Sequence, residues 1–254
     1  MGKNDHKEIL KTELEEPEAP AAWEAVTVAG NEERPMALAY IRSMLDPFIE
    51  LRGDRLNSDD RSIIAGVGFL GEEPVAIIGQ QRRPALEGQR YHVYPDGLRK
   101  AQRLINLASR FKLPLVTLID TQGADPGLEA EEQGIGNAIA TTLSMMVEAP
   151  IPIVSVIIGE GGSEGALALA VANRVLMMEN AILSIISPEE AAGLMYQDEA
   201  RADEAAESLK LTARDCLELG IVDQVVQEPT GGAHTNHDEA ARQLRRILLQ
   251  ELAD

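Results

Sequence analysis

Apolar residues recur at helical spacing in several segments of the chain. Between Asp96 and Lys112 the apolar positions lie three or four residues apart, which predicts an amphipathic helix with Asp96 as its cap. Ser187-Pro-Glu-Glu190 has the order of a capping box with proline at the first helical position. Further helices are predicted from Pro35 and over 131–148, 164–172, 212–220 and 238–252.

Short apolar runs alternate with these helices and predict buried strands. The runs at 62–69 and 74–78 flank a Gly-Glu-Glu turn at 71–73, so they are expected to form a hairpin. Later runs lie at 113–119, 150–158, 174–178, 181–186 and 221–226. Since helices separate most of these runs, the pattern predicts an α/β fold with mostly parallel strands.

The first 33 residues differ from the rest of the chain. They are acidic and punctuated by prolines, a composition that disfavours a packed core, so we expect a flexible acidic tail over 1–33. Residues 34–254 are then one folded domain. A secretory signal is not visible, and the longest apolar runs fall well short of the roughly 20 residues that a membrane helix needs. We therefore expect a cytoplasmic protein.

Charge and cysteine content exclude several kinds of site. The formal net charge of -19 argues against general nucleic-acid binding, because phosphate backbones are repelled. The single cysteine, Cys216, permits neither an internal disulfide nor a thiolate metal cluster, so a packing role is expected and no metal. A basic set could hold a phosphate or could simply form a solvated helix face; it comprises Arg82, Arg83, Arg90, Arg99, Lys100 and Arg103.

A glycine-rich turn at 159–168 is the strongest chemical signal. It lies between a predicted buried strand and a helix, where backbone N–H groups can stabilise negative charge. One interpretation is an oxyanion hole formed by the N–H groups of Gly165 and Ala166. The other is a tight turn that only allows close packing. The spacing leaves both open.

The same turn fits a different class of enzyme. Residues 161–165 match the G-x-S-x-G nucleophile elbow, and Ser163 is followed by Asp223 and then by His234 or His237. This order suggests an α/β-hydrolase triad, although the chain has no His-Gly-Gly-Gly oxyanion motif. Two loops add candidates: 120–127 follows a strand, where α/β sheets place ligands, and 228–234 ends in a titratable histidine.

Eight ordered segments are similar to the carboxyltransferase alpha subunits of bacterial acetyl-CoA carboxylase. They include Leu51-Arg-Gly-Asp-Arg55, Phe111-Lys-Leu-Pro114 and Glu228-Pro-Thr-Gly-Gly-Ala-His234. The others lie at 34–40, 97–103, 119–121, 158–163 and 186–189. The resemblance spans roughly residues 34–252. It implies a crotonase-like superhelix of strand–strand–helix units.

The resemblance also implies an activity and partners. A subunit of this family pairs with a zinc-ribbon beta subunit in a hetero-oligomer. The pair moves a carboxyl group from carboxybiotin, held by a biotin carboxyl carrier protein, to acetyl-CoA, giving malonyl-CoA for fatty acid synthesis. Gly165 and Ala166 would then steady charge on biotin. The implied cofactor-binding residues are Gly161, Gly162, Gly123, Ala124 and Gly127.

Three departures from the family pattern bear on substrate choice. Gln122 and Asp125 replace a proline and a tyrosine of the family loop, and Glu164 replaces a glycine. The region 80–94 is also shorter and less basic than is usual. Three alternatives therefore stay open: a crotonase-fold acyl-CoA decarboxylase, a hydrolase of that fold, or a non-catalytic partner subunit.

Overall fold

The computed structural model describes residues 21–56, 58–82 and 92–253, in which one large sheet carries the core. Its strands follow the order β1-β2-β3-β5-β7-β8-β10, and β9 pairs with β7 beyond the end of β8. The strands are β1 (Phe48–Glu50), β2 (Ile63–Leu70), β3 (Glu73–Gln80), β5 (Leu115–Thr121), β7 (Ile153–Gly162), β8 (Arg174–Met178), β9 (Ile182–Ser184) and β10 (Gln224–Val226). A two-stranded ribbon joins β4 (His92–Val93) to β6 (Gly123–Ala124).

The predicted hairpin and the parallel sheet are both confirmed. β2 and β3 pair antiparallel from Ile63 opposite Gln80 to Leu70 opposite Glu73. From β3 onward the neighbours β5, β7, β8 and β10 are parallel. Because the carboxyl ends of parallel strands meet at one edge, the loops after β5 and β7 lie together.

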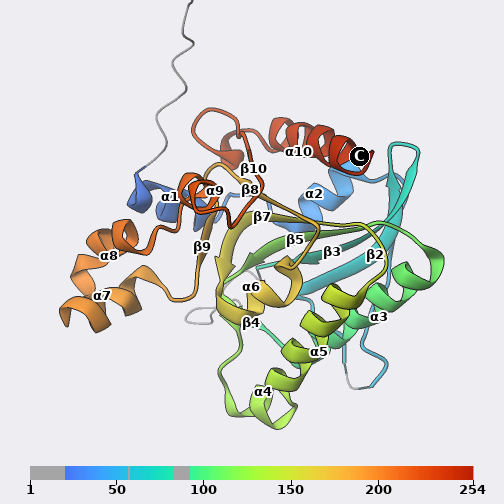
Figure 1. Cartoon of the computed structure of the whole chain (residues 1–254), viewed down its shortest axis with the longest axis horizontal. Coiled ribbons are helices and arrows are strands. Elements are labelled where there is room, and N and C mark those ends of the chain that lie inside the picture. Colours follow the sequence, from blue (N-terminus) through green and yellow to red (C-terminus); the bar gives the residue numbers. More distant parts are fainter. Residues whose placement is uncertain (1–20, 57, 83–91, 254) are drawn as a thin grey trace, which may run out of the picture.

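Helices cover both faces of this sheet. One face carries α3 (Pro95–Phe111), α5 (Ile135–Glu148) and α6 (Ser163–Ala170), and the other carries α2 (Ala37–Met44) and α10 (His237–Glu251) (Figure 1). The interior is aliphatic, and Leu98, Leu118 and Ile157 are all buried. Among the described residues, no helix is long and apolar enough to cross a membrane.

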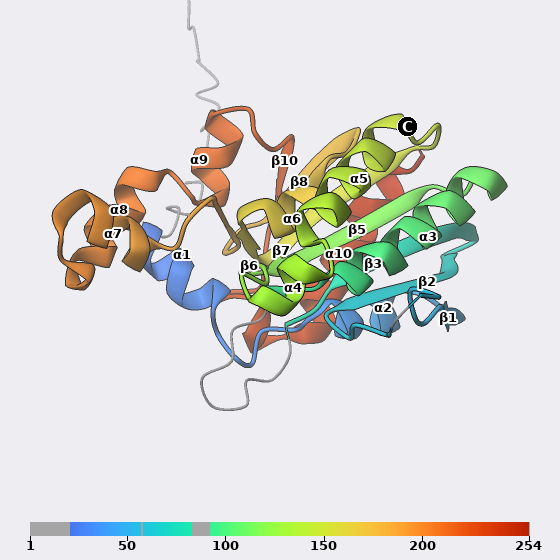
Figure 2. The same ribbon diagram turned by 90° about the horizontal axis from the view of Figure 1, so that it is seen from below.

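An arm projects from one end of the sheet (Figure 2). It consists of α7 (Pro188–Tyr196) and α8 (Ala202–Leu209), and α1 (Ala22–Ala29) packs beside it. The predicted Ser187 capping box opens α7 and is confirmed. Between α8 and β10 lies α9 (Ala213–Glu218), whose N-terminus is capped by the Thr212 side chain.

The prediction that order begins at residue 34 is wrong, since α1 is already folded. Ala25 and Ala29 are fully buried, and they pack with Ile182 and Leu211 from the far half of the chain. An eight-residue helix is marginal alone, so tertiary packing rather than local sequence stabilises it. Residues 1–20 of the predicted tail lie outside the described residues.

Two helix predictions also need correction. The segment predicted as one helix over 131–148 is two, α4 (Leu128–Glu132) and α5, because Gly134 adopts a left-handed conformation between them. Asp96 is not the cap of α3, whose capping position is Tyr94. The Asp96 carboxylate instead accepts a hydrogen bond from the Ser58 hydroxyl.

Candidate functional site

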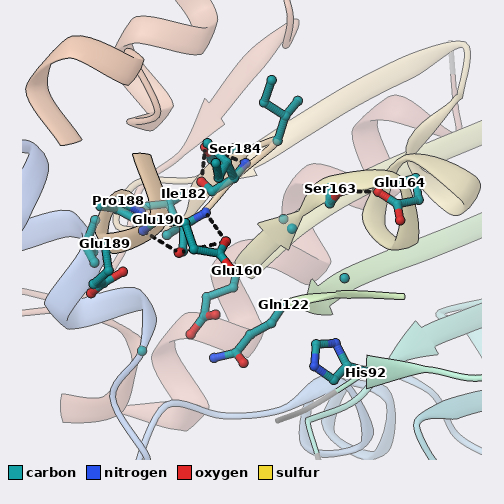
Figure 3. Close-up of a pocket in the computed structure, with 18 of the residues that line it drawn as sticks. His92, Gln122, Glu160, Ser163, Glu164, Ile182, Ser184, Pro188, Glu189 and Glu190 are labelled. Carbon is teal, nitrogen blue, oxygen red and sulfur yellow. Dashed lines mark hydrogen bonds between the residues drawn. The ribbon is translucent and has the colours of Figure 1, made fainter. Parts of the chain in front are cut away.

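A cavity of about 530 Å³ opens at the carboxyl ends of β5 and β7. Its walls come from α1, the β4–β6 ribbon, the glycine turn where β7 runs into α6, and the segment from β9 into α7 (Figure 3). A volume of this size lies within the usual range of roughly 300–1,000 Å³ for small-molecule sites. The lining includes Gly123, Ala124, Gly161, Gly162, Ser163, Gln122, Glu160, His92 and Glu164.

The glycine turn packs directly on the loop after β5. A Cβ atom at Gly162 would lie 2.3 Å from the carbonyl oxygen of Gln122, and one at Gly165 would lie 2.5 Å from the backbone nitrogen of Ala124. Both distances are below any tolerable contact, so only glycine fits at either position. Between them Ser163 has φ of 52°, a left-handed conformation that begins α6.

The predicted site residues divide into two groups. Gly161, Gly162, Gly123 and Ala124 line the cavity, whereas Gly127, Gly165 and Ala166 do not. Gly165 and Ala166 are buried beneath the turn, and the Gly165 carbonyl accepts a hydrogen bond of 2.6 Å from Gln80.

Helix geometry also distinguishes the backbone N–H of Gly165 from that of Ala166. The first four N–H groups of an α-helix have no partner within it, and in α6 these are the groups of residues 162–165. The N–H of Ala166 is the first that can reach an intrahelical carbonyl, that of Gly162. Among the turn residues that line the cavity, Ser163 and Glu164 therefore offer N–H groups that the helix itself does not use.

A buried network of charged side chains lies next to the glycine turn and holds Glu160 in place. The Arg82 guanidinium contacts Asp120 at 3.1 Å and Glu160 at 3.3 Å, and the Asp120 carboxylate also accepts the backbone N–H of Glu160. Burial raises the pKa of Asp120 and of Glu160, against the opposing effect of Arg82. Asp120 thus ties the end of β5 to the end of β7.

Glu160, Gln122 and His92 are cavity residues that sequence reasoning missed. Glu160 lies within β7 and Gln122 directly follows β5, and the Gln122 side chain acts to lower the pKa of Glu160 against the effect of burial. His92 stands opposite Gly123 in the ribbon, and its buried Nδ1 has no hydrogen-bond partner among the described residues. The sequence marks Gln122 only as a departure from the family loop, because its proximity to Glu160 depends on the register of β5 on β7.

The hydrolase triad is not assembled. The Ser163 hydroxyl donates to Glu164, and the Asp223 carboxylate accepts the N–H of Val175 while pairing with Arg174. His234 and His237 line a separate cavity of about 640 Å³ beside α2. The predicted nucleophile Ser163, acid Asp223 and base histidines therefore lie in three separate places and make contacts with other residues instead of with one another.

The Glu164 side chain is directed away from the acidic part of the cavity. It is exposed, and Figure 3 places it beside Ser163, well apart from Glu160, Glu189 and Glu190. Glu189, Glu190 and Glu199 give the opposite wall a negative character. Within the described residues, no cluster of side chains is arranged to hold a metal ion.

The described members of the basic set make internal contacts: three form ion pairs and one donates to a backbone carbonyl. Arg99 contacts Asp54 at 3.0 Å, and Lys100, only 2% exposed, contacts Asp59 at 2.5 Å. The expectation of a solvated helix face is therefore wrong for Lys100. Arg82 belongs to the network above, Arg103 donates to the Gly53 carbonyl, and Arg83 and Arg90 lie outside the described residues.

The loop at 228–234 has a structural function. Glu228 accepts two hydrogen bonds from Arg34 and others from the backbone of Asn180 and Ala233.

Cys216 is packed in the core, as expected, and burial raises the pKa of its thiol to about 11.

Solved structures with the same fold are carboxyl-handling enzymes. The transcarboxylase 12S hexamer core with bound methylmalonyl-coenzyme A matches with a TM-score of 0.73 at 19% identity, covering 92% of this chain and 44% of that one. A Pseudomonas malonate decarboxylase hetero-tetramer with coenzyme A matches with a TM-score of 0.69 at 17% identity, over 85% and 87%. These likenesses show the fold alone, and they confirm the predicted crotonase-like α/β class.

Sequence relatives are closer and establish the family. The alpha subunit of acetyl-coenzyme A carboxylase carboxyl transferase from Xanthomonas campestris is 46% identical over 91% of this chain and 74% of its own length. The corresponding subunit from Rhodospirillum centenum is 47% identical over 90% and 74%. The family model "Acetyl co-enzyme A carboxylase carboxyltransferase-like" matches residues 6–254. The chain therefore belongs to the carboxyltransferase family of acetyl-CoA carboxylase alpha subunits.

Proposed function

We propose that this chain is the alpha-type subunit of a biotin-dependent acyl-CoA carboxylase and forms the biotin side of its carboxyltransferase site. The observation that carries the proposal is the glycine cradle. Gly162 and Gly165 lie against the backbone of 122–124 and open a cavity beside them. In this family, carboxybiotin supplies the activated carboxyl group, which passes to acetyl-CoA to give malonyl-CoA.

The cavity fits a small bicyclic ring system with a polar edge. Its floor is glycine backbone, which lets a ligand approach the main chain closely. Its walls carry apolar Val26 and Ile182 beside polar Gln122 and Glu160. Such a mixture, apolar with a few placed polar groups, is typical of cofactor sites.

The proposed chemistry is electrostatic. N–H groups at the start of α6 stabilise negative charge on a ligand oxygen, as the dipole at a helix N-terminus does. We assign this role to Ser163 and Glu164, which line the cavity, rather than to Ala166, whose N–H is committed within the helix. Gly165 completes the cradle. Gly123, Ala124 and Gly161 form the adjoining wall.

The remaining components are expected on other chains. A zinc-ribbon beta-type subunit would complete the acyl-CoA side, and a carrier protein would deliver the biotin. A hetero-oligomeric, cytoplasmic assembly serving fatty acid synthesis is part of the same proposal. In the described residues no observation favours the decarboxylase, the hydrolase or the non-catalytic alternative over it.

Reconstitution tests the function. The purified chain is mixed with a beta-type subunit from the same source, carboxylated carrier protein and acetyl-CoA, and malonyl-CoA is measured by mass spectrometry. We expect product only when both subunits are present. Equal activity from this chain alone would contradict the two-subunit assignment, and no activity from the pair would contradict the reaction.

A further inference from the structure

Two polar side chains meet at one corner of the cavity and are not used by the glycine cradle. Glu160 lies near the end of β7, and Gln122 directly follows β5. Both side chains line the cavity, where they lie beside each other (Figure 3), and the Gln122 amide acts to lower the pKa of Glu160 against the effect of burial. They therefore form one recognition element built from two neighbouring strands.

The rear of this element is fixed. Arg82, itself buried, contacts Oε1 of Glu160, and Asp120 accepts the Glu160 backbone N–H. These contacts hold the carboxylate from the protein side, while Glu160 and Gln122 keep a common face on the cavity. A preorganised pair loses little freedom when a ligand binds.

The hydrogen-bonding groups that Glu160 and Gln122 turn to the cavity indicate which kind of ligand they can bind. An ionised carboxylate accepts hydrogen bonds at two oxygens, and a glutamine amide has two N–H donors and one oxygen. With Arg82 at one oxygen, Glu160 still offers an acceptor to the cavity, and Gln122 offers a donor beside it. Their complement is a group with an N–H adjacent to a C=O on the same edge, as in a cyclic urea or a cis-amide.

The carboxylates around this corner of the cavity favour a ligand that presents an uncharged edge to Glu160 and Gln122. Glu189 is close enough to Glu160 to act on its ionisation, and Glu190 and Glu199 line the same cavity. These carboxylates repel a phosphate or carboxylate but not a neutral urea. An anionic group is better placed at the N–H groups of the α6 start, across the cavity.

We propose that Glu160 and Gln122 form the specificity pair for the ureido ring of biotin, with Glu160 accepting the ring N–H and Gln122 donating to the ring carbonyl. This inference rests on the proposed function for the identity of the ligand. It adds two side chains to a site otherwise formed by backbone. Discrimination against ligands without an N–H follows from Glu160, because its carboxylate would be left unpaired.

Binding of small ureas to the full chain tests the pair without turnover. Isothermal titration calorimetry or ligand-observed NMR is run with biotin, with 2-imidazolidinone, and with 1,3-dimethyl-2-imidazolidinone, which keeps the carbonyl but has no N–H. We expect biotin and 2-imidazolidinone to bind competitively and the dimethyl compound to bind at least about tenfold more weakly. Equal affinity for the two imidazolidinones, or no biotin binding, would overturn the inference.

Two variants locate the effect in the pair. Gln122→Met removes the amide from an exposed side chain, and Glu160→Gln keeps an acceptor but loses the charge. Each should raise the Kd for biotin by about three- to thirtyfold. The matched controls, Gln133→Met and Glu218→Gln, change the same groups outside the cavity and should leave the Kd unchanged.

The outcomes separate this inference from the proposed function. Melting temperatures are recorded for every variant, and Gln122→Met keeps the test valid if Glu160→Gln destabilises the fold. If the reconstituted pair makes malonyl-CoA but both cavity variants bind biotin like wild type, the function stands and the inference fails. If biotin binding depends on the pair but malonyl-CoA is not formed, the inference stands and the assigned reaction fails.

Discussion

Arg34 and Glu228 form a fully buried bidentate ion pair that joins the two ends of the folded chain. The guanidinium donates to the carboxylate at 2.8 and 2.5 Å, and its Nε donates to the carbonyl of Ile158 at 2.8 Å. Ile158 lies in β7, two residues before Glu160. The pair therefore fixes the strand that carries the cavity turn.

Removing the charge of Glu228 should destabilise the protein strongly. Glu228→Gln leaves Arg34 buried without its counter-ion, and breaking such a pair costs about 3–5 kcal/mol. Urea unfolding followed by circular dichroism measures the change. Glu218→Gln is the control, because its pair with Arg214 is exposed and should contribute less than about 1 kcal/mol. Equal effects of the two substitutions would contradict this account.

The same pair predicts a pH dependence of stability. Burial works to raise the pKa of Glu228, but the bonds from Arg34 and the backbone hold it below its ordinary value. A lowered folded pKa contributes stability above the unfolded value of 4.5, and this contribution disappears as pH falls through the folded value. The difference in unfolding free energy between wild type and Glu228→Gln should therefore shrink from about pH 7 to about pH 3.5. A constant difference would show that Glu228 has an ordinary pKa.

Two glycine substitutions should have opposite effects. At Gly165 a Cβ would meet the backbone of 123–124 at 2.5 Å, so Gly165→Ala should cost about 1–3 kcal/mol or more. Gly136 lies in α5 with open space around it, so Gly136→Ala should stabilise by about 0.4–1 kcal/mol. Thermal unfolding of both variants measures the contrast. Stabilisation by Gly165→Ala would mean that the turn and the loop are not in contact.

Ser163→Ala should reduce carboxyl transfer by less than about tenfold, since only the local backbone is needed. A true nucleophile would lose orders of magnitude. Because Ser163 has a positive φ, Ser163→Gly is a companion variant that relieves the backbone while also removing the hydroxyl. Covalent labelling of Ser163 by a fluorophosphonate would support the hydrolase hypothesis instead.

Glu164→Gly restores the residue usual in the family at this position. The carboxylate is exposed and directed away from Glu160, so the transfer rate should stay within about threefold of wild type. The melting temperature should fall slightly, because a carboxylate in the first helical turn interacts favourably with the dipole. Steady-state assays of carboxyl transfer compare wild type, Glu164→Gly and Glu164→Gln, the last of which removes only the charge. A large loss in both variants would assign Glu164 to the chemistry.

Local signals predicted the parts of the fold that local physics determines. The hairpin around Gly71 and the capping box at Ser187 are specified by a few adjacent residues. Helix α1 is not, because its buried alanines are stabilised by Ile182, far along the chain. The split at Gly134 was missed because a glycine within an apolar pattern does not reveal its φ.

The candidate site shows the same division. The glycine turn was predictable, since strand, turn and helix are contiguous in sequence. The partnership of Glu160 with Gln122 was not, because it depends on pairing between β5 and β7 with an irregularity between Ile119 and Thr121. Long-range register of this kind leaves no trace in residue spacing.

β7 changes its pairing partner along its length, so the part of the strand that holds the core together differs from the part that shapes the cavity. Its residues 154–157 pair with β8 inside the core, while residues 160–162 pair with β9, which begins one cavity wall. Substitutions or small insertions between Asn180 and Ser187 can therefore reshape that wall while the pairing of β7 with β8 is preserved. Changes at the exposed Ile185 can vary what the cavity accepts at little cost to stability, whereas Ile182 also packs against α1, so laboratory selection for new ring ligands has its natural starting point at Ile185.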